Sequence, residues 1–206
     1  RGISGQHLFR IDYEDVSKIS SNYEKQLLLL IKKKIPEVDA IILSDYDKGT
    51  LTEKLVKGVI SLANVHGKLI TADCKPANMN FYKGIDLLKP NKKEAIEMTG
   101  ENNLEEAGKI LSKKLNSIIV ITRGSEGMSI FEKGSKSFHM YTKTQYVYDI
   151  SGAGDTVLAI ITLALVSGKS LREAVKIANI GAGIVIGKLG VATITLEELQ
   201  NGKRWN

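Results

Sequence analysis

The sequence has little of several things, and each scarcity excludes a class of protein. Its 206 residues include a single cysteine, Cys74, so no disulfide can form within the chain. One cysteine fits a reducing compartment, and we expect a cytoplasmic protein. No apolar run is long enough to span a membrane, and no segment has the pattern of a signal peptide. The length of 206 residues fits one domain with a sizeable core, and 43% hydrophobic and 25% charged residues indicate a globular chain.

Positive charge is in excess but is not concentrated. The 29 Lys and Arg residues outnumber the 23 Asp and Glu residues, which gives a net charge of +6 and suits an anionic ligand. Lys32, Lys33 and Lys34 form the one tight basic run, at the end of a predicted helix where cations are favoured anyway. We therefore expect neither a nucleic acid nor a membrane as partner. The chain begins without Met, and we expect an N-terminal portion to precede it.

Strand and helix signals alternate along the chain. Short apolar runs that end in polar residues predict strands, and longer periodic segments with capping residues predict helices. This alternation predicts an α/β fold with a doubly wound, mostly parallel sheet and helices on both faces. The predicted strands cover 40–43, 68–72, 85–88 and 118–122, with an antiparallel pair at 128–131 and 137–141; the predicted helices cover 21–31, 52–65, 94–98, 104–115, 153–167, 171–186 and 196–201.

Polar clusters follow four consecutive predicted strands, at 45–48, 73–75, 89–91 and 122–124. Any one cluster could be ordinary loop chemistry. In open α/β sheets, however, ligands bind outside the carboxyl ends of the strands. Four clusters at successive strand ends therefore predict a ligand site at that edge of the sheet.

The most informative segment is DISGAGD at 149–155, directly before an apolar run that predicts a buried helix. Gly152, Ala153 and Gly154 would leave several backbone N–H groups unpaired at the helix start, which makes an anion hole. Asp155 in the first turn would repel a bound phosphate, so its better use is as the general base that deprotonates an attacking hydroxyl. The alternative is a common glycine turn followed by an acid that the helix dipole favours. The segment is neither a Walker A motif nor a complete dinucleotide fingerprint.

Two further motifs have both a structural and a functional interpretation. Asn91 and Glu94 give N-x-x-E at a helix start, which by itself favours a capping arrangement; alternatively they hold water around Mg²⁺. TRGSEG at 122–127 gives T-x-G-x-x-G between two strands. It is either a hairpin turn or a backbone loop against a nucleotide, made by Thr122, Gly124 and Gly127, with Arg123 free to reach a phosphate.

In this order the three motifs resemble the ribokinase/PfkB family of small-molecule kinases. Ser151 stands where that family usually has Thr, a mild change. The resemblance implies that Asp155 is the catalytic base and that the backbone of Gly152 to Asp155 holds the transferred phosphoryl group. It also implies a ribokinase-like fold that uses ATP and Mg²⁺, with Glu94 acting on the metal through water. Asn179 and Gly183 on the penultimate helix would wall the adenine, together with the loop 188–190.

Further segments are similar to the kinase domain of bacterial heptose 7-phosphate kinases, the ADP-heptose synthase family. This resemblance implies phosphorylation of D-glycero-D-manno-heptose 7-phosphate at its anomeric hydroxyl, on the route to the lipopolysaccharide core. Asp45, Lys48 and Lys75 are then our candidates for contacts with this substrate. The matching segments are QHLFRID at 6–12, LSDYDKG at 43–49, VIGKLGVAT at 185–193, HM at 139–140 and VYD at 147–149.

Two departures from that family bear on what this chain does. The N-terminal third of the family's kinase domain, which carries a lid and much of the sugar site, has no counterpart in this sequence. Residues 1–206 therefore match the C-terminal, nucleotide-binding portion of that domain. Cys74 stands where the family has Pro, within Asp73-Cys74-Lys75. The lid usually builds a dimer, so a homodimer is expected only for the full-length protein. The alternatives are a nucleotide-binding fragment without catalysis and a kinase for another sugar phosphate, such as fructose 1-phosphate or tagatose 6-phosphate.

Overall fold

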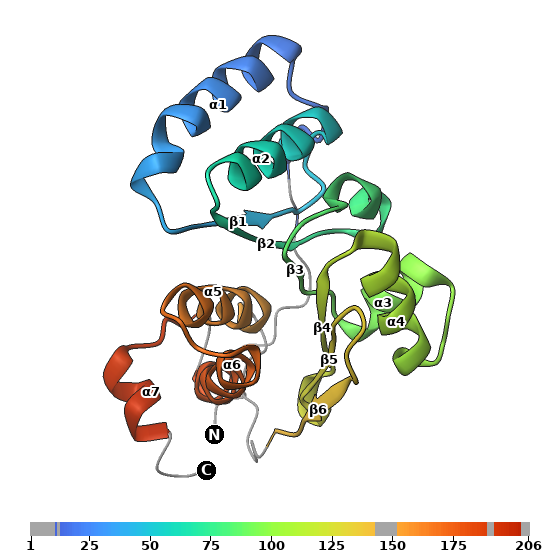
Figure 1. The fold of residues 1–206 in the computed structure, drawn as a ribbon, viewed down its shortest axis with the longest axis vertical. Coiled ribbons are helices and arrows are strands. Elements are labelled where there is room, and N and C mark those ends of the chain that lie inside the picture. Colours follow the sequence, from blue (N-terminus) through green and yellow to red (C-terminus); the bar gives the residue numbers. More distant parts are fainter. Residues whose placement is uncertain (1–10, 12, 143–151, 189–191, 203–206) are drawn as a thin grey trace.

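The strands form one sheet whose spatial order follows the chain (Figure 1). The computed structural model describes residues 11, 13–142, 152–188 and 192–202. The first four strands pair in parallel, and the last two run antiparallel to their neighbours. The strands are β1 (Ala40–Ser44), β2 (Leu69–Asp73), β3 (Leu87–Leu88), β4 (Ile118–Thr122), β5 (Met128–Phe131) and β6 (Phe138–Met140).

Helices cover both faces of this sheet. The helices before and between the parallel strands lie on one face, and the three that follow β6 lie on the other (Figure 1). On the first face are α1 (Ser21–Lys34), α2 (Glu53–Val65), α3 (Lys92–Thr99) and α4 (Leu104–Leu115); on the second are α5 (Ala153–Val166), α6 (Leu171–Ile186) and α7 (Leu196–Gly202). Three short 3₁₀ segments lie at Ile35–Glu37, Pro76–Tyr82 and Gly124–Glu126.

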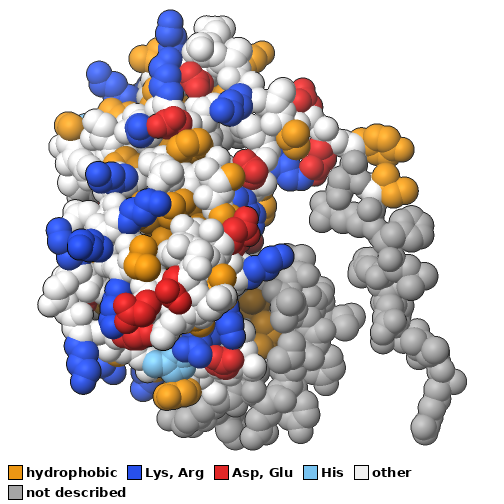
Figure 2. Space-filling view, turned by 90° about the vertical axis from the view of Figure 1, so that its right-hand side faces the viewer, with side chains coloured by type: hydrophobic (Ala, Val, Ile, Leu, Met, Phe, Trp, Pro, Cys, Tyr) orange, Lys and Arg blue, Asp and Glu red, His pale blue; other side chains and the backbone are white. Residues whose placement is uncertain are grey.

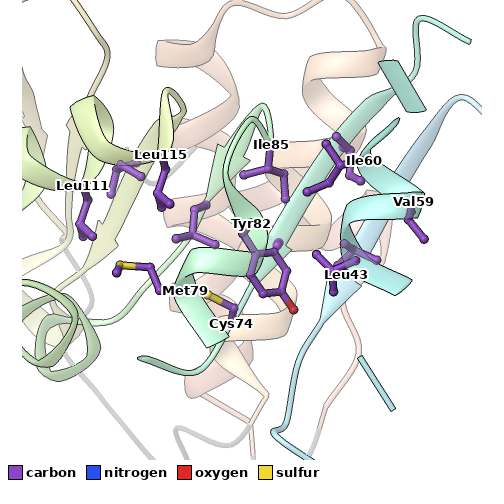
Figure 3. Packing of buried hydrophobic residues seen from close by; sticks show 14 of the residues in the cluster. Leu43, Val59, Ile60, Cys74, Met79, Tyr82, Ile85, Leu111 and Leu115 are labelled. Atoms are coloured by element: carbon purple, nitrogen blue, oxygen red, sulfur yellow. The ribbon is translucent and has the colours of Figure 1, made fainter. Parts of the chain in front are cut away.

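Each face of the sheet has its own hydrophobic cluster. The cluster under α1 to α4 centres on the fully buried ring of Tyr82, which Figure 3 shows among Leu43, Cys74, Met79 and Ile85. The second cluster packs the apolar sides of α5 and α6 against the opposite side of the sheet. Parallel strands that are covered on both faces need continuous apolar sequence, and this explains the unbroken apolar run of β4.

Helix α5 is fixed to the sheet by a buried polar contact as well as by packing. The Thr71 hydroxyl on β2 and the Thr162 hydroxyl on α5 lie 2.7 Å apart, and Thr162 also donates to the Leu158 carbonyl. A buried hydroxyl pair is stable only when both groups are satisfied, so it defines how α5 lies on the strands. The start of α5 is thereby held at a defined place relative to the strand ends.

The predicted α/β fold, with a mostly parallel sheet and helices on both faces, is confirmed. Every predicted strand and helix has a counterpart, most with boundaries shifted by one to three residues. No helix among the described residues is long and apolar enough to cross a membrane. On the face in Figure 2, Lys and Arg side chains are interspersed with Asp and Glu rather than gathered in one patch. Of the predicted motifs, Asp12 and the segments 6–10, 147–151 and 189–191 lie outside the described residues.

Candidate functional site

The four polar clusters meet at the carboxyl edge of the parallel strands. Backbone hydrogen bonds continue the strand pairing at the strand ends: Asp45 N–H donates to the Asp73 carbonyl at 2.9 Å, and Thr122 N–H donates to the Pro90 carbonyl at 3.0 Å. Lys89 N–H likewise donates to the Ala72 carbonyl at 2.9 Å. The polar residues that follow are therefore side by side, as the topology predicts.

A cavity of about 680 Å³ lies at this edge, between the strand ends and the helices α3, α5 and α6. Its size is suited to a nucleotide-sized ligand. Most of the predicted site residues line it, including the whole segment Gly152 to Asp155. The predicted residues on its wall are Lys75, Asn91, Glu94, Thr122, Arg123, Gly124, Gly127, Gly152, Ala153, Gly154, Asp155, Asn179 and Gly183.

The start of α5 is open. Its N-cap is Gly152, which adopts a φ of +77° that glycine tolerates and which has no side chain to cap the helix. Thr156 N–H donates to the Gly152 carbonyl, so the N–H groups of the residues between them are those that a helix start leaves unpaired. We call Gly152–Asp155 the anion turn. Asp155 is exposed on the cavity wall, and its Oδ2 accepts a hydrogen bond of 3.2 Å from the Tyr46 hydroxyl.

The start of α3, by contrast, is closed by its own side chains. The Asn91 side chain accepts from Glu94 N–H, and Glu94 Oε2 accepts from Asn91 N–H, both at 2.9 Å. Glu94 Oε1 also forms an ion pair of 2.9 Å with Lys75, and this hydrogen bond raises the pKa of Lys75. The capping arrangement that the motif favours on its own is therefore present. It leaves the buried Glu94 carboxylate at the cavity wall, where it can still act on water.

A buried lysine supplies positive charge next to the anion turn. Lys89 is 2% exposed, and its ammonium forms an ion pair of 2.7 Å with Asp73. Burial raises the pKa of the Asp73 carboxyl, although the Lys89 ammonium beside it opposes that effect. A Cβ added at Gly154 would lie 3.4 Å from the Lys89 ammonium, so this charge sits against the turn. An anion bound at the turn would lie close to a cation that is held in place.

The T-x-G-x-x-G segment is a tight hairpin between β4 and β5, and it also forms part of the cavity wall. Gly127 has a φ of +96°, and a Cβ there would lie 2.0 Å from the Met140 carbonyl oxygen, so only glycine fits. Arg123, which the functional interpretation of this segment takes to be free, has partners in this structure. Its guanidinium pairs with Glu126 and donates to the Ser129 hydroxyl at 3.2 Å. To reach a phosphate, Arg123 would first have to leave these partners.

The small residues on α6 divide between packing and cavity. A Cβ at Gly181 would lie 2.2 Å from a methyl group of Ile160, so this glycine allows α6 to approach α5 closely. Gly183 instead lines the cavity, as does Asn179, which donates to the Tyr141 carbonyl at 2.8 Å. A flat ligand could therefore approach α6 at Gly183.

Two predicted substrate residues do not line this cavity. Asp45 is 5% exposed and accepts from the Tyr82 hydroxyl at 2.9 Å and from the Asn78 amide at 3.0 Å. Lys48 pairs with Glu14 and lines a separate hollow of about 620 Å³ beside β1. Tyr46, between them, reaches both hollows. The sequence placed Tyr46 in a polar cluster, but spacing alone could not show its contact with a residue 109 positions away.

The described residues offer no ready-made metal centre. Within them, no group of three or more His, Cys, Asp and Glu side chains could hold a metal ion. Mg²⁺ usually keeps several waters and binds through substrate phosphates with one or two carboxylates. Glu94 and Asp73 are the carboxylates on the cavity wall besides Asp155, and the oxygen donors of this wall suit such an arrangement.

Comparisons with known proteins agree with this geometry. Residues 13–199 match the sequence profile of the pfkB family carbohydrate kinases. The bifunctional protein HldE of a Nitratiruptor species is 40% identical over 207 residues, which cover 98% of this chain and 44% of that protein. The HldE protein of Helicobacter pylori is 38% identical over 94% of this chain and 43% of its own length. The chain thus spans less than half the length of these curated relatives.

Solved structures share the fold at lower sequence identity. Phosphofructokinase-2 from Escherichia coli, in complex with potassium, superposes with a TM-score of 0.75 at 18% identity, over 91% of this chain and 63% of that one. Ribokinase from Arabidopsis thaliana, complexed with ribose and ATP, gives a TM-score of 0.72 at 21% identity, over 90% of this chain and 60% of that one. The predicted ribokinase-like fold is confirmed.

Proposed function

The chain belongs to the pfkB family of carbohydrate kinases, and from this premise we propose that it transfers the γ-phosphoryl group of ATP to D-glycero-D-manno-heptose 7-phosphate. The acceptor is the anomeric hydroxyl, and the product is the 1,7-bisphosphate. One observation carries the proposal: an uncapped helix start and an exposed carboxylate face the same cavity as the T-x-G-x-x-G hairpin and the end of α6. The similarity to HldE proteins favours the heptose phosphate as acceptor.

Each part of the cavity has a role in the proposed transfer. Asp155 takes the proton of the acceptor hydroxyl as its oxygen bonds to phosphorus, and the bond to the bridging oxygen of ATP breaks to release ADP. The N–H groups of the anion turn and the Lys89 ammonium stabilise the charge on the transferred group. Thr122, Gly124 and Gly127 hold the nucleotide by backbone contacts, and Asn179 and Gly183 border the adenine. Asn91 contributes through the capping of α3.

The metal and the acceptor contacts belong to the same proposal. When bound, Mg²⁺ would neutralise the phosphate oxygens and hold them in line for transfer. Glu94 would orient water on the metal, and Lys75 beside it would contact the acceptor or its phosphate. Residues 1–206 would form the C-terminal, nucleotide-binding portion of a cytoplasmic kinase that forms a homodimer at full length. The remainder of the full-length chain would provide the rest of the sugar site.

The test is turnover of a panel of sugar phosphates by the full-length protein with ATP and Mg²⁺. Phosphorus NMR should show a new anomeric phosphate on heptose 7-phosphate, with fructose 1-phosphate and tagatose 6-phosphate turned over far more slowly. If the protein preferred fructose 1-phosphate or tagatose 6-phosphate, the proposed substrate would be wrong, but the proposed kinase activity would stand. ATP binding by calorimetry without turnover of any sugar phosphate would leave a nucleotide-binding module. A folded protein without affinity for ATP would exclude both.

A further inference from the structure

Tyr46 connects the carboxyl end of β1 to the proposed base, Asp155. It follows β1 by two residues, is 59% exposed, and lines the cavity. Its hydroxyl donates to Asp155 Oδ2 at 3.2 Å, which links the β1 end to the first turn of α5. Figure 1 shows α5 on the opposite side of the sheet from the helices that flank β1, so the contact is made only at the carboxyl edge.

The turn that carries Tyr46 is held by hydrogen bonds that centre on the buried Asp45 and extend to the half-buried Asn78 and the exposed Asp47. Asp45 accepts from Asp47 N–H at 2.8 Å, and the Asn78 amide bridges the Asp45 and Asp47 carboxylates at 3.0 Å each. Asp47 adopts a φ of +55°, in the left-handed region that few residues other than Gly, Asn and Asp adopt. The residues on either side of Tyr46 are thus held by hydrogen bonds, which restrict the backbone that carries its ring.

A hydrogen bond to one carboxylate oxygen leaves the other oxygen for the reaction. The terminal torsion of an aspartate is broad, so an exposed carboxylate samples many orientations. Donation from Tyr46 to Oδ2 restricts this rotation and leaves Oδ1 for the acceptor. A base must lie within hydrogen-bond reach of the proton that it removes, and small misplacements of catalytic groups reduce rates strongly.

We propose that Tyr46 is a positioning residue for Asp155, and that the hydrogen bonds around Asp45 serve the reaction by holding the Tyr46 turn. This inference rests on the proposed kinase function. It also gives Asp45 a role away from the substrate, because its carboxylate holds the turn and the turn places Tyr46 against Asp155. The position of Tyr46 further fixes the side from which the acceptor hydroxyl meets Asp155.

The test is Tyr46→Phe in the full-length protein, which keeps the ring and removes the hydroxyl. The loss of a hydrogen bond to a charged group in a partly exposed site should lower kcat by about 5- to 50-fold, with the KM for ATP unchanged. Tyr23→Phe on α1 is the matched control, because Tyr23 is 61% exposed and lies away from the cavity. It should leave kcat and both KM values unchanged.

A double-mutant cycle with Asp155→Asn separates positioning from other roles. If Tyr46 acts through the base, adding Tyr46→Phe to Asp155→Asn should lower kcat little further. An equal loss in both backgrounds, a change confined to the KM for the sugar phosphate, or an unchanged kcat in Tyr46→Phe would each overturn the inference while leaving the kinase function in place. A wild-type protein that turns over no sugar phosphate would overturn both.

Discussion

Two helices begin at the same cavity, and they begin in opposite ways. Each has an acidic residue at its third position: Glu94 in α3 and Asp155 in α5. Glu94 turns back to its own N-cap and closes the α3 start, whereas the α5 start has a glycine cap and its acid is directed to Tyr46. The closed start stabilises the fold, and the open start keeps its N–H groups available for an anion.

The start of α6, which lies away from the cavity, is closed by a capping box like that of α3. At the start of α6, Ser170 accepts from Glu173 N–H, and Glu173 accepts from Ser170 N–H at 2.9 Å. Neither residue lines the cavity. The open start of α5 is thus a departure that costs helix stability, and the expected compensation is ligand binding.

The largest expected effect comes from Asp155→Asn, which removes the proposed base and keeps the shape of its side chain. General-base assistance contributes about 10²- to 10⁴-fold, so turnover in the full-length protein should fall within that range or further. The affinity for ATP should stay the same or rise, because a negative charge near the phosphates is gone. Steady-state kinetics and calorimetry measure the two quantities.

Glu173→Gln is the matched control for Asp155→Asn, since it removes the charge of an acid at the same helix position away from the cavity. It should lower the melting temperature slightly and leave turnover unchanged. Wild-type turnover in Asp155→Asn would mean that the anion turn is not the catalytic centre.

The next effect comes from Glu94→Gln, which keeps an oxygen for the Asn91 N–H and removes the charge. If Glu94 orients water on Mg²⁺, the magnesium concentration for half-maximal rate should rise and turnover should fall, by up to about 100-fold, as for other outer partners of a metal. A magnesium titration of the initial rate is the measurement. Loss of thermal stability with an unchanged magnesium profile would leave Glu94 as a cap and as the partner of Lys75.

Asn91→Ala should mainly lower the free energy of unfolding, because Asn91 caps the closed start of α3. Loss of an N-cap side chain costs about 0.5–2 kcal/mol, which urea unfolding can measure. Asp155→Asn should lower the stability hardly at all, because the Asn side chain keeps an oxygen that can accept the same hydrogen bonds at the helix start. Equal losses in the two variants would mean that the two helix starts do not differ as described.

The sequence predicted the strands, helices and polar strand ends that form the cavity, but it did not predict which side chains contact one another there. The strands, helices and polar strand ends follow from periodicity and capping residues, and the shared edge follows from parallel pairing. Glu94 showed a capping pattern because its partner lies three residues away. The contacts of Tyr46 and Lys89 were missed because their partners come from distant elements. The pairing of Arg123 with Glu126 was missed because it depends on the hairpin geometry.

The smallest effect on turnover should come from Cys74, which lies between Asp73 and Lys75 on the side of the closed start. The thiol is 1% exposed, and burial raises its pKa, with further contributions from the Asp45, Asp73 and Glu94 carboxylates. The thiolate is the reactive form, so a raised pKa leaves less of it at any pH below that value. Alkylation by iodoacetamide at about pH 8, near the ordinary pKa of a free thiol, should therefore be much slower in the folded protein than in urea, and should speed up as the pH rises. Cys74→Ala should leave turnover unchanged. Rapid alkylation of the folded protein with loss of activity would instead place a reactive thiol at the site and would contradict the raised pKa of Cys74.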